Sequence, residues 1–209
     1  MLSRVAVGEI LQSYNLDAPD LLCEQIRSYI ALLLKWNKRI SLTSVEEPAE
    51  IVRYHFAESF LAVKAYRSLD GRLADVGSGA GFPGIALKMY VPQLDVSLIE
   101  SNSKKCVFLA EVVRSLELPK ISVIHSRYQD MISPKSSFNL MSARALGEIS
   151  AFLGWAAGAI LSGGRVLLWL GTQGVDEASA APNWKWKPPF AIPRTKGRFI
   201  LVGSPQNTN

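Results

Sequence analysis

Four glycines within eight residues are the feature of the sequence best suited to chemistry. They are Gly77, Gly79, Gly81 and Gly84, and they lie between a short apolar segment at 73–74 and a predicted helix over 85–90. In a strand–turn–helix unit, the backbone N–H groups at the helix start face a polar ligand. Glycines let that ligand lie directly on the backbone, because no Cβ intervenes. We therefore predict that this turn binds a nucleotide-type cofactor.

Two acids help to choose the cofactor. The run 79–84 fits the dinucleotide pattern G-x-G-x-x-G, which alone is a weak signal. Asp75, however, stands two residues before Gly77 at the predicted strand end, where a carboxylate repels a pyrophosphate but suits the ammonium and sulfonium of S-adenosylmethionine. Glu100, at the end of the alternating segment 96–100, is placed to accept hydrogen bonds from ribose hydroxyls of either cofactor. S-adenosyl-L-methionine is the preferred prediction and NAD the alternative.

The elements that must position these residues follow an alternating pattern from residue 72 onward. Strands separated by helices of this length predict βαβ units, hence an α/β fold with a parallel sheet covered on both faces. Ligands of such sheets bind beyond the carboxyl ends of the strands, which places Gly77, Glu100, the turn 127–130 and Arg144 around one pocket. The expected later strands are 121–125, 138–142, 165–170 and 199–202, and the expected helices are 85–90, 103–116 and 149–161.

Residues 1–68 have helical periodicity and little strand signal. We expect a helical extension over 1–68 packed on an α/β domain over 69–204, followed by a frayed tail at 205–209. On one predicted helix, His55, Glu58 and Ser59 share a face. A lone helical histidine is more often structural than catalytic, so we favour a structural role for His55 over one at the cofactor mouth.

Composition limits the possible functions. The chain has 209 residues, 48% of them hydrophobic and 20% charged, with no apolar run of membrane-spanning length and no signal-peptide pattern. We therefore expect a cytoplasmic protein with no membrane partner. Cys23 and Cys106 lack metal-ligand spacing, so no metal site is expected. The net charge of +5 favours a polyanionic partner without proving one.

Two basic stretches are candidates for RNA contact. Lys35, Lys38 and Arg39 end a predicted helix, where they either contact an RNA backbone or form a solvated basic end. Residues 183–190 interleave tryptophan and lysine, a pattern that can stack and neutralise single-stranded RNA. Two prolines there exclude a central strand, so the alternative is a surface loop or edge segment whose aromatic rings pack inward.

Methyl transfer is an in-line displacement and depends chiefly on aligning an acceptor lone pair. The sequence has neither an Asn-Pro-Pro-Tyr-like turn after the fourth strand nor a Pro-Cys nucleophile. A purine N7 has a ready lone pair and needs no general base. Arg127 and Arg144 are candidates to hold such an acceptor, because guanine N7 and O6 together accept from one guanidinium. The alternative for each arginine is a structural ion pair at a strand end, and we favour this alternative more for Arg127 than for Arg144.

Several of these motifs together resemble one family, the bacterial 16S ribosomal RNA guanine-N7 methyltransferases known as RsmG or GidB (glucose-inhibited division protein B). The resemblance covers about residues 35–171, with a weaker match at 197–202, and the run 75–84 with its Gly-Phe-Pro-Gly ending is its most specific part. The supporting motifs are His55-Phe56-Ala57-Glu58-Ser59, Glu100-Ser101, Lys104-Lys105, Phe108-Leu109, Ser126-Arg127 and Arg144-Ala145.

The resemblance implies a class I S-adenosylmethionine-dependent methyltransferase, a Rossmann-like sheet flanked by helices with a helical N-terminal extension. It implies that Gly77 and Phe82 line the donor, that Glu100 takes the ribose, and that Arg144 contacts donor or acceptor. Tyr128 and Gln129 are implied to hold the adenosine end. The whole expected cofactor set is Asp75, Gly77, Ser78, Gly79, Gly81, Phe82, Glu100, Tyr128, Gln129 and Arg144. The implied partner is 16S rRNA or an assembling or complete 30S subunit, and we expect a monomer.

The sequence also departs from the family pattern. The mild departures are Ser41 for Asn, Glu58 for Asp, Ala143 for Ser and Gln129 for Glu. Leu170 stands where the family has a lysine, which removes a cation from the expected acceptor mouth; we expect Arg144 and nearby basic groups to suffice. Two alternatives stay open: a catalytically idle rRNA- or ribosome-binding factor that retains the donor pocket, and a NAD-dependent enzyme.

Overall fold

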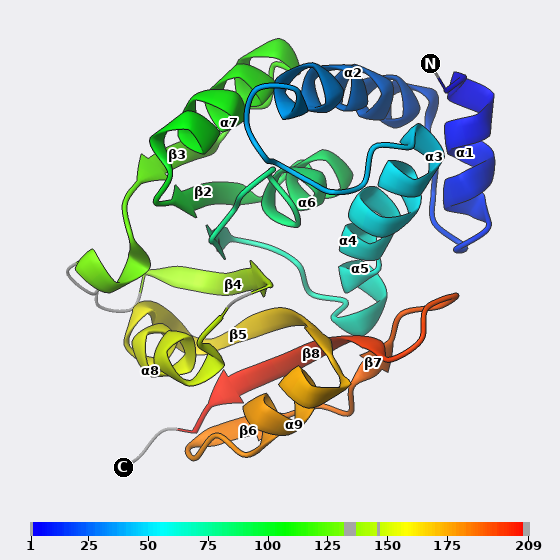
Figure 1. The fold of residues 1–209 in the computed structure, drawn as a ribbon. Helices are drawn as coiled ribbons and strands as arrows, with labels where there is room; N and C mark the ends of the chain where they lie inside the picture. Colours follow the sequence, from blue (N-terminus) through cyan, green and yellow to red (C-terminus); the bar gives the residue numbers. More distant parts are fainter. Residues whose placement is uncertain (1, 132–136, 146, 207–209) are drawn as a thin grey trace.

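The computed structural model of the protein describes residues 2–131, 137–145 and 147–206. Its centre is an eight-stranded sheet with the order β3-β2-β1-β4-β5-β8-β6, and β7 pairs with β8 (Figure 1). The strands are β1 (Arg72–Val76), β2 (Asp95–Glu100), β3 (Ile121–His125), β4 (Phe138–Arg144), β5 (Ile160–Gly171), β6 (Trp184–Trp186), β7 (Phe190–Ala191) and β8 (Arg198–Pro205). β1 to β5 run parallel, and β8 pairs antiparallel with β5, β6 and β7. The predicted α/β class is confirmed.

The helices cover both faces of the sheet. They are α1 (Arg4–Gln12), α2 (Asp20–Asn37), α3 (Pro48–Ile51), a π-helical segment (Val52–Ala57), α4 (Glu58–Phe60), α5 (Ala62–Ala65), α6 (Gly84–Tyr90), α7 (Ser103–Ser115), a 3₁₀ turn (Tyr128–Asp130), α8 (Ile149–Ala159) and α9 (Thr172–Ser179). In Figure 1, α1 to α7 lie on one side and α8 and α9 on the other. None of the helices within the described ranges is long and apolar enough to cross a membrane.

Two apolar clusters form the core, one on each face. The first joins the N-terminal helices, α6 and α7 to alternate strand residues such as Leu73 and Leu98. The second joins α8 and the edge strand β6 to the intervening residues, such as Ala74 and Val76. Strand side chains alternate between faces, so β1 contributes to both clusters. The N-terminal helices therefore share one core with the sheet.

Three segments differ from the sequence-based expectations. β5 begins at Ile160, so the Gly163-Gly164 pair lies inside the strand, beside a register shift opposite 138–140. α9 was not predicted. The predicted start of the C-terminal tail, residue 205, is wrong, because Pro205 is the last residue of β8 and pairs with Trp184. Residues 207–209 of that predicted tail lie outside the described residues.

The tryptophan–lysine stretch forms β6, the edge strand of the sheet. Trp184 and Trp186 stack on each other with ring centroids 5.5 Å apart and pack on the second core cluster. Their rings are thus used in packing, which supports the inward-facing interpretation over base stacking.

Candidate functional site

The turn between β1 and α6 is held against the neighbouring strand by its backbone. The N–H groups of Gly77 and Ser78 both donate to the carbonyl of Ile99, at 2.9 and 3.2 Å. Gly77 adopts φ +70°, a conformation that favours glycine. The turn therefore begins at the carboxyl end of β1, the edge at which parallel α/β sheets bind ligands.

A cavity of about 320 Å³ opens beside this turn. It is lined by Val76, Gly77, Ile99, Ser101, Ser126, Arg127, Tyr128 and Gln129, all at the carboxyl ends of β1, β2 and β3. Gly77, Tyr128 and Gln129 were predicted as donor ligands, and the structure brings them together here. Ser101 and Ser126 were quoted only as parts of family motifs and not as ligands, although each directly follows a strand end, the position that marks ligand contacts in such sheets.

Tyr128 is the aromatic wall of this cavity. Its ring contacts Trp155 on α8 at 5.3 Å between centroids and Phe152 at 6.1 Å. Burial raises the pKa of Tyr128, so its hydroxyl stays protonated. The half-buried ring is therefore held in place from behind by α8 and presents an apolar face with one polar tip.

Glu100 is fixed in orientation at the end of β2. Its carboxylate accepts hydrogen bonds from the backbone N–H of Gly79 at 2.8 Å and of Asn102 at 2.7 Å. The residue is 7% exposed and lies between two cavity-lining residues, Ile99 and Ser101. Each carboxylate oxygen keeps a second lone pair, so the group can accept from a ligand hydroxyl without moving.

Asp75 takes a different position from the one expected. It is fully buried, and its Oδ1 accepts from the Ser142 hydroxyl at 2.6 Å. A Cβ on Gly84 would lie 2.6 Å from Asp75 Oδ2, so the carboxylate sits under the start of α6. Burial raises its pKa to about 6. Asp75 supports the turn from below and is not among the residues that line the cavity.

Phe82 and Gly81 also serve packing with the N-terminal helices. The Phe82 ring stacks between Tyr29, at 5.2 Å, and His55, at 4.7 Å. Tyr29 donates to the Ala80 carbonyl at 2.7 Å, and a Cβ on Gly81 would collide with its hydroxyl. Ser78 is likewise buried and donates to the Asp75 carbonyl. Phe82, Gly81 and Ser78 therefore contact other parts of the protein, whereas we expected them to face the donor.

A second cavity, of about 210 Å³, lies across the ends of β4, β5 and β8. Its lining is Arg144, Ala145, Trp169, Leu170, Gly171, Ile192, Arg198 and Phe199. Arg144 donates to the Tyr54 carbonyl at 2.9 Å and lies 3.5 Å from Glu58, whereas Arg198 lies 2.7 Å from the same carboxylate oxygen. Glu58 is 1% exposed, so it is a buried anion between two arginines. Sequence reasoning missed Arg198, because nothing in its local pattern shows that β8 returns beside β5.

The two predicted acceptor arginines do not meet. Arg127 lines the cavity beside the glycine turn and Arg144 lines the second one. The two cavities are neighbours, since Val76, which precedes Gly77, pairs with Ala143, which precedes Arg144.

His55 is structural in its contacts. Its Nε2 lies 2.8 Å from the Thr43 hydroxyl, and Glu58 is occupied by the arginines. Burial, with a further contribution from Arg144, lowers its pKa to about 3, so the imidazole is neutral at physiological pH. In the described part of the chain, no group of three or more His, Cys, Asp or Glu side chains could hold a metal ion.

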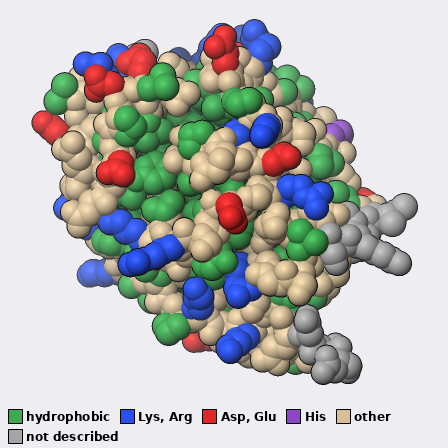
Figure 2. All heavy atoms as spheres, turned by 180° about the vertical axis from the view of Figure 1, so that it is seen from behind, with side chains coloured by type: hydrophobic (Ala, Val, Ile, Leu, Met, Phe, Trp, Pro, Cys, Tyr) green, Lys and Arg blue, Asp and Glu red, His purple; other side chains and the backbone are tan. Residues whose placement is uncertain are grey.

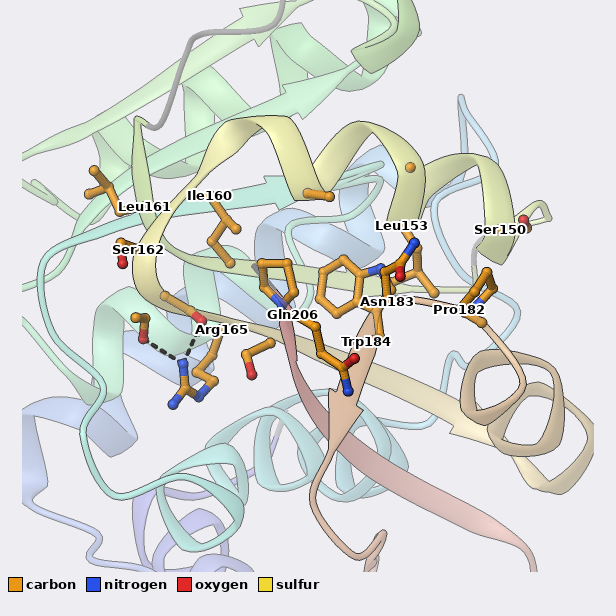
Figure 3. Close-up of a pocket in the computed structure, with 17 residues that line it drawn as sticks. Ser150, Leu153, Ile160, Leu161, Ser162, Arg165, Pro182, Asn183, Trp184 and Gln206 are labelled. Atoms are coloured by element: carbon orange, nitrogen blue, oxygen red, sulfur yellow. Dashed lines mark hydrogen bonds between the residues drawn. The ribbon is translucent and has the colours of Figure 1, made fainter. Parts of the chain in front are cut away.

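A larger cavity, of about 830 Å³, lies elsewhere. Figure 3 shows it between α8, the start of β5 and the end of β8, with Trp184 and Asn183 on one wall and Arg165 on another. Arg165 is turned back onto the carbonyls of Gly163 and Gly164. The beginning of a parallel strand is the edge opposite the ligand-binding one, so this cavity is separate from the candidate site.

Comparison with known proteins agrees with this geometry. The family model described as rRNA small subunit methyltransferase G matches residues 22–186. Ribosomal RNA small subunit methyltransferase G of Xanthomonas axonopodis pv. citri (strain 306) is 36% identical over 195 residues, 92% of this chain and 90% of that one. The protein of the same name from Pseudomonas aeruginosa (strain LESB58) is 37% identical over 185 residues, 85% and 84% of the two chains. The crystal structure of ribosomal protein L11 methylase from Lactobacillus delbrueckii subsp. bulgaricus superposes with a TM-score of 0.58 at 16% identity, covering 71% and 77% of the chains.

Proposed function

Because the chain belongs to the rRNA small subunit methyltransferase G family, we propose that it transfers a methyl group from S-adenosyl-L-methionine to N7 of a guanine in 16S rRNA. The observation that carries this proposal is the pair of neighbouring cavities at one edge of the sheet. One has a glycine turn and a fixed carboxylate, and the other has two arginines on a buried anion. We further propose that the protein acts in the cytoplasm, as a monomer, on bare rRNA or on the 30S subunit.

The first cavity fits the donor. Gly77 leaves the backbone open, Glu100 is oriented to accept from ribose hydroxyls, and Tyr128 offers a ring face for the adenine. Ser101, Ser126 and Gln129 add polar groups around the nucleoside. When bound, S-adenosylmethionine supplies an electrophilic methyl group on a sulfonium. The residues of this chain need only hold it so that the methyl group points toward the second cavity.

The second cavity fits the acceptor. Guanine N7 carries a lone pair, and N7 and O6 together accept from one guanidinium, so a positioned arginine can orient the base without a general base. Arg144 is the nearer of the two arginines to the glycine turn in the sheet order. Arg198 supplies a cation in the cavity that Leu170 also lines. The two residues come together because β8, which begins at Arg198, pairs with β5, which carries Leu170. We propose that Arg198 offsets the absence of the family lysine at position 170.

The test is a methyl-transfer assay with methyl-labelled S-adenosylmethionine and either bare 16S rRNA or intact 30S particles. The RNA is then digested to nucleosides and analysed by mass spectrometry. Labelled 7-methylguanosine supports the proposal, and the better of the two substrates shows when the enzyme acts. Donor binding with no labelled nucleoside from either substrate would overturn it in favour of an idle binding factor, and binding of NAD in place of the donor would favour an oxidoreductase.

A further inference from the structure

The whole net charge of the protein lies in its C-terminal segment. Of the 23 Lys and Arg residues, Lys185, Lys187, Arg194, Lys196 and Arg198 fall after residue 179, where the sequence has no Asp or Glu. The remaining 18 cations are matched by 18 acids in the preceding residues, so the excess of +5 belongs to this segment alone. We call residues 185–198 the basic hairpin. A concentrated charge of this kind creates a local positive potential that a balanced surface lacks.

Four cations of the basic hairpin, Lys185, Lys187, Arg194 and Lys196, are exposed, and Arg198 is half-buried. Lys187 lies over the ring of Tyr66 at 4.8 Å, Arg194 over Tyr14 at 5.3 Å, and Arg198 over Tyr54 at 5.8 Å. All three rings belong to the N-terminal 68 residues. Arg194 also donates to the Ser13 carbonyl, and Arg198 is paired with Glu58. Cation–π contact orients the charged group, and the N–H donors of Lys187 and the remaining ones of Arg194 can meet an anion. The side chains therefore lose less freedom on binding than unsupported lysines do.

This surface is continuous with the acceptor cavity. Ile192, Arg198 and Phe199 from the basic hairpin and the start of β8 form part of that cavity's wall. In Figure 1 the β7–β8 loop reaches out past α5, and Figure 2, seen from behind, shows Lys and Arg side chains gathered on the lower left, with most Asp and Glu side chains above. An RNA whose target base enters the cavity must pass its backbone along adjacent protein surface.

The contacts available here are with phosphates and not with bases. Trp184 and Trp186, the tryptophans of the segment, are stacked on each other and packed on the core. Exposed cations without free aromatic rings neutralise a nucleic-acid backbone without reading its sequence.

We propose that the basic hairpin is the surface that binds the rRNA backbone beside the target guanine, so that it sets affinity for the RNA while the two cavities carry out the transfer. This inference rests on the proposed function for the identity of the polyanion. It assigns substrate binding to a segment far in sequence from the donor motif.

The experiment compares two triple variants of equal charge change. The first replaces Lys187, Arg194 and Lys196 with Gln. The control replaces Arg72, Arg114 and Lys120, exposed residues at the ends of β1, α7 and β3 opposite to the two cavities, with Gln. Binding of 16S rRNA is measured by fluorescence anisotropy at several salt concentrations, together with donor binding by calorimetry and methyl-transfer kinetics.

We expect the hairpin variant to bind rRNA at least about tenfold more weakly and to lower the slope of log affinity against log salt by about 2, since each phosphate contact contributes roughly 0.7–0.9. Its KM for rRNA rises while kcat and donor affinity stay unchanged. An unaltered slope, or an equal loss in the control variant, would overturn the inference. If the unmodified protein methylates no RNA but the hairpin variant alone loses RNA binding, the proposed function fails, whereas the RNA-binding role of the basic hairpin stands.

Two further variants separate charge from folding. Exchanging Lys for Arg and Arg for Lys at the same three positions keeps the charge and should keep rRNA affinity within about twofold. If the Gln triple does not fold, the Lys185→Gln and Lys196→Gln pair, at exposed positions without a tyrosine partner among the contacts described above, takes its place. That pair should lower the salt slope by about 1.5, and no change in slope would overturn the inference.

Discussion

Arg198 Nη2 lies 2.7 Å from Glu58 Oε2, which joins the last strand of the sheet to a helix of the N-terminal extension. Glu58 is 1% exposed and also lies 3.5 Å from Arg144. One buried carboxylate thus holds two guanidinium groups that would repel each other without it. The N-terminal extension therefore takes part in shaping the proposed acceptor cavity.

The first prediction concerns this carboxylate. Glu58→Gln keeps the size of the side chain and removes its charge, so Arg144 and Arg198 lose their common anchor and move apart. We expect kcat/KM for rRNA to fall at least about tenfold, because the two guanidinium groups that line the acceptor cavity are then no longer held in one position. Donor affinity, measured by calorimetry, should change less than twofold. Glu50→Gln, which breaks a partly exposed pair with Arg53, is the control; an equal loss there would contradict the prediction.

The same residue predicts a pH dependence of stability. Burial raises the pKa of Glu58 from its ordinary value of 4.5 to about 6, although Arg144 and Arg198 act to lower it. The folded state therefore takes up this proton at a higher pH than the unfolded state. Above about pH 6 the ionised Glu58 therefore lowers the free energy of unfolding. This loss is recovered as the pH falls toward 4.5, by about 2 kcal/mol in all.

Urea unfolding of the unmodified protein and of Glu58→Gln, between about pH 7.5 and 4.5, measures this effect. The free energy of unfolding of the unmodified protein should rise relative to the variant as the pH falls. Other groups with raised pKa values, such as Asp75, are present in both proteins and cancel. A difference that stays constant with pH would show that Glu58 does not titrate in this range.

The donor turn gives a third prediction. Gly77 has φ +70° and lines the cavity, so Gly77→Asp adds backbone strain, volume and negative charge at one point. We expect donor affinity to fall at least about a hundredfold in a calorimetric titration. Gly154→Asp adds the same charge on α8, where a new Cβ has open space, and should bind the donor normally. Undiminished binding by Gly77→Asp would mean that the donor lies elsewhere.

Leu170 gives a fourth prediction. Its side chain lines the acceptor cavity beside Arg144 and Arg198. If these arginines supply the cation that the family places at this position, a third cation adds repulsion and little binding. We expect Leu170→Lys to change kcat/KM for rRNA by less than about twofold, with Leu170→Met as the neutral control. A severalfold increase would show that the arginines do not suffice.

The sequence predicted those parts of the site that depend on local order along the chain. The glycine turn, Glu100 and Tyr128 lie at or just after the carboxyl end of a strand, and parallel strands bring such residues to one edge. Whether a side chain of this turn faces the donor cavity or the protein interior was predicted less well. Asp75 and Phe82 point under the turn toward α6 and α2, because the N-terminal helices cover that face and need a partner for their apolar side chains.

Contacts between distant segments could not be predicted. Arg198 reaches Glu58 only because β8 inserts antiparallel between β5 and the edge strand β6. No periodicity in residues 190–205 specifies that register, which is set by pairing with β5. The contact of His55 with the Thr43 hydroxyl fits the structural role favoured for it, but nothing in the sequence indicated that Thr43 would be its partner.

The last prediction tests why Gly81 is a glycine. It adopts φ +85°, and a Cβ there would collide with the Tyr29 hydroxyl and lie 2.9 Å from Ile85 Cδ1. Gly81→Ala should therefore lower the free energy of unfolding by about 2–4 kcal/mol, of which roughly 1–2 is the cost of a left-handed backbone and the rest is steric. Tyr29→Phe removes the colliding hydroxyl together with its hydrogen bond to Ala80. If the collision dominates, Gly81→Ala costs at least about 1 kcal/mol less in the Tyr29→Phe background, as a double-mutant cycle of urea unfolding would measure. Strict additivity of the two changes would mean that the Tyr29 hydroxyl does not require the glycine, which would leave the backbone conformation and the contact with Ile85 as its causes.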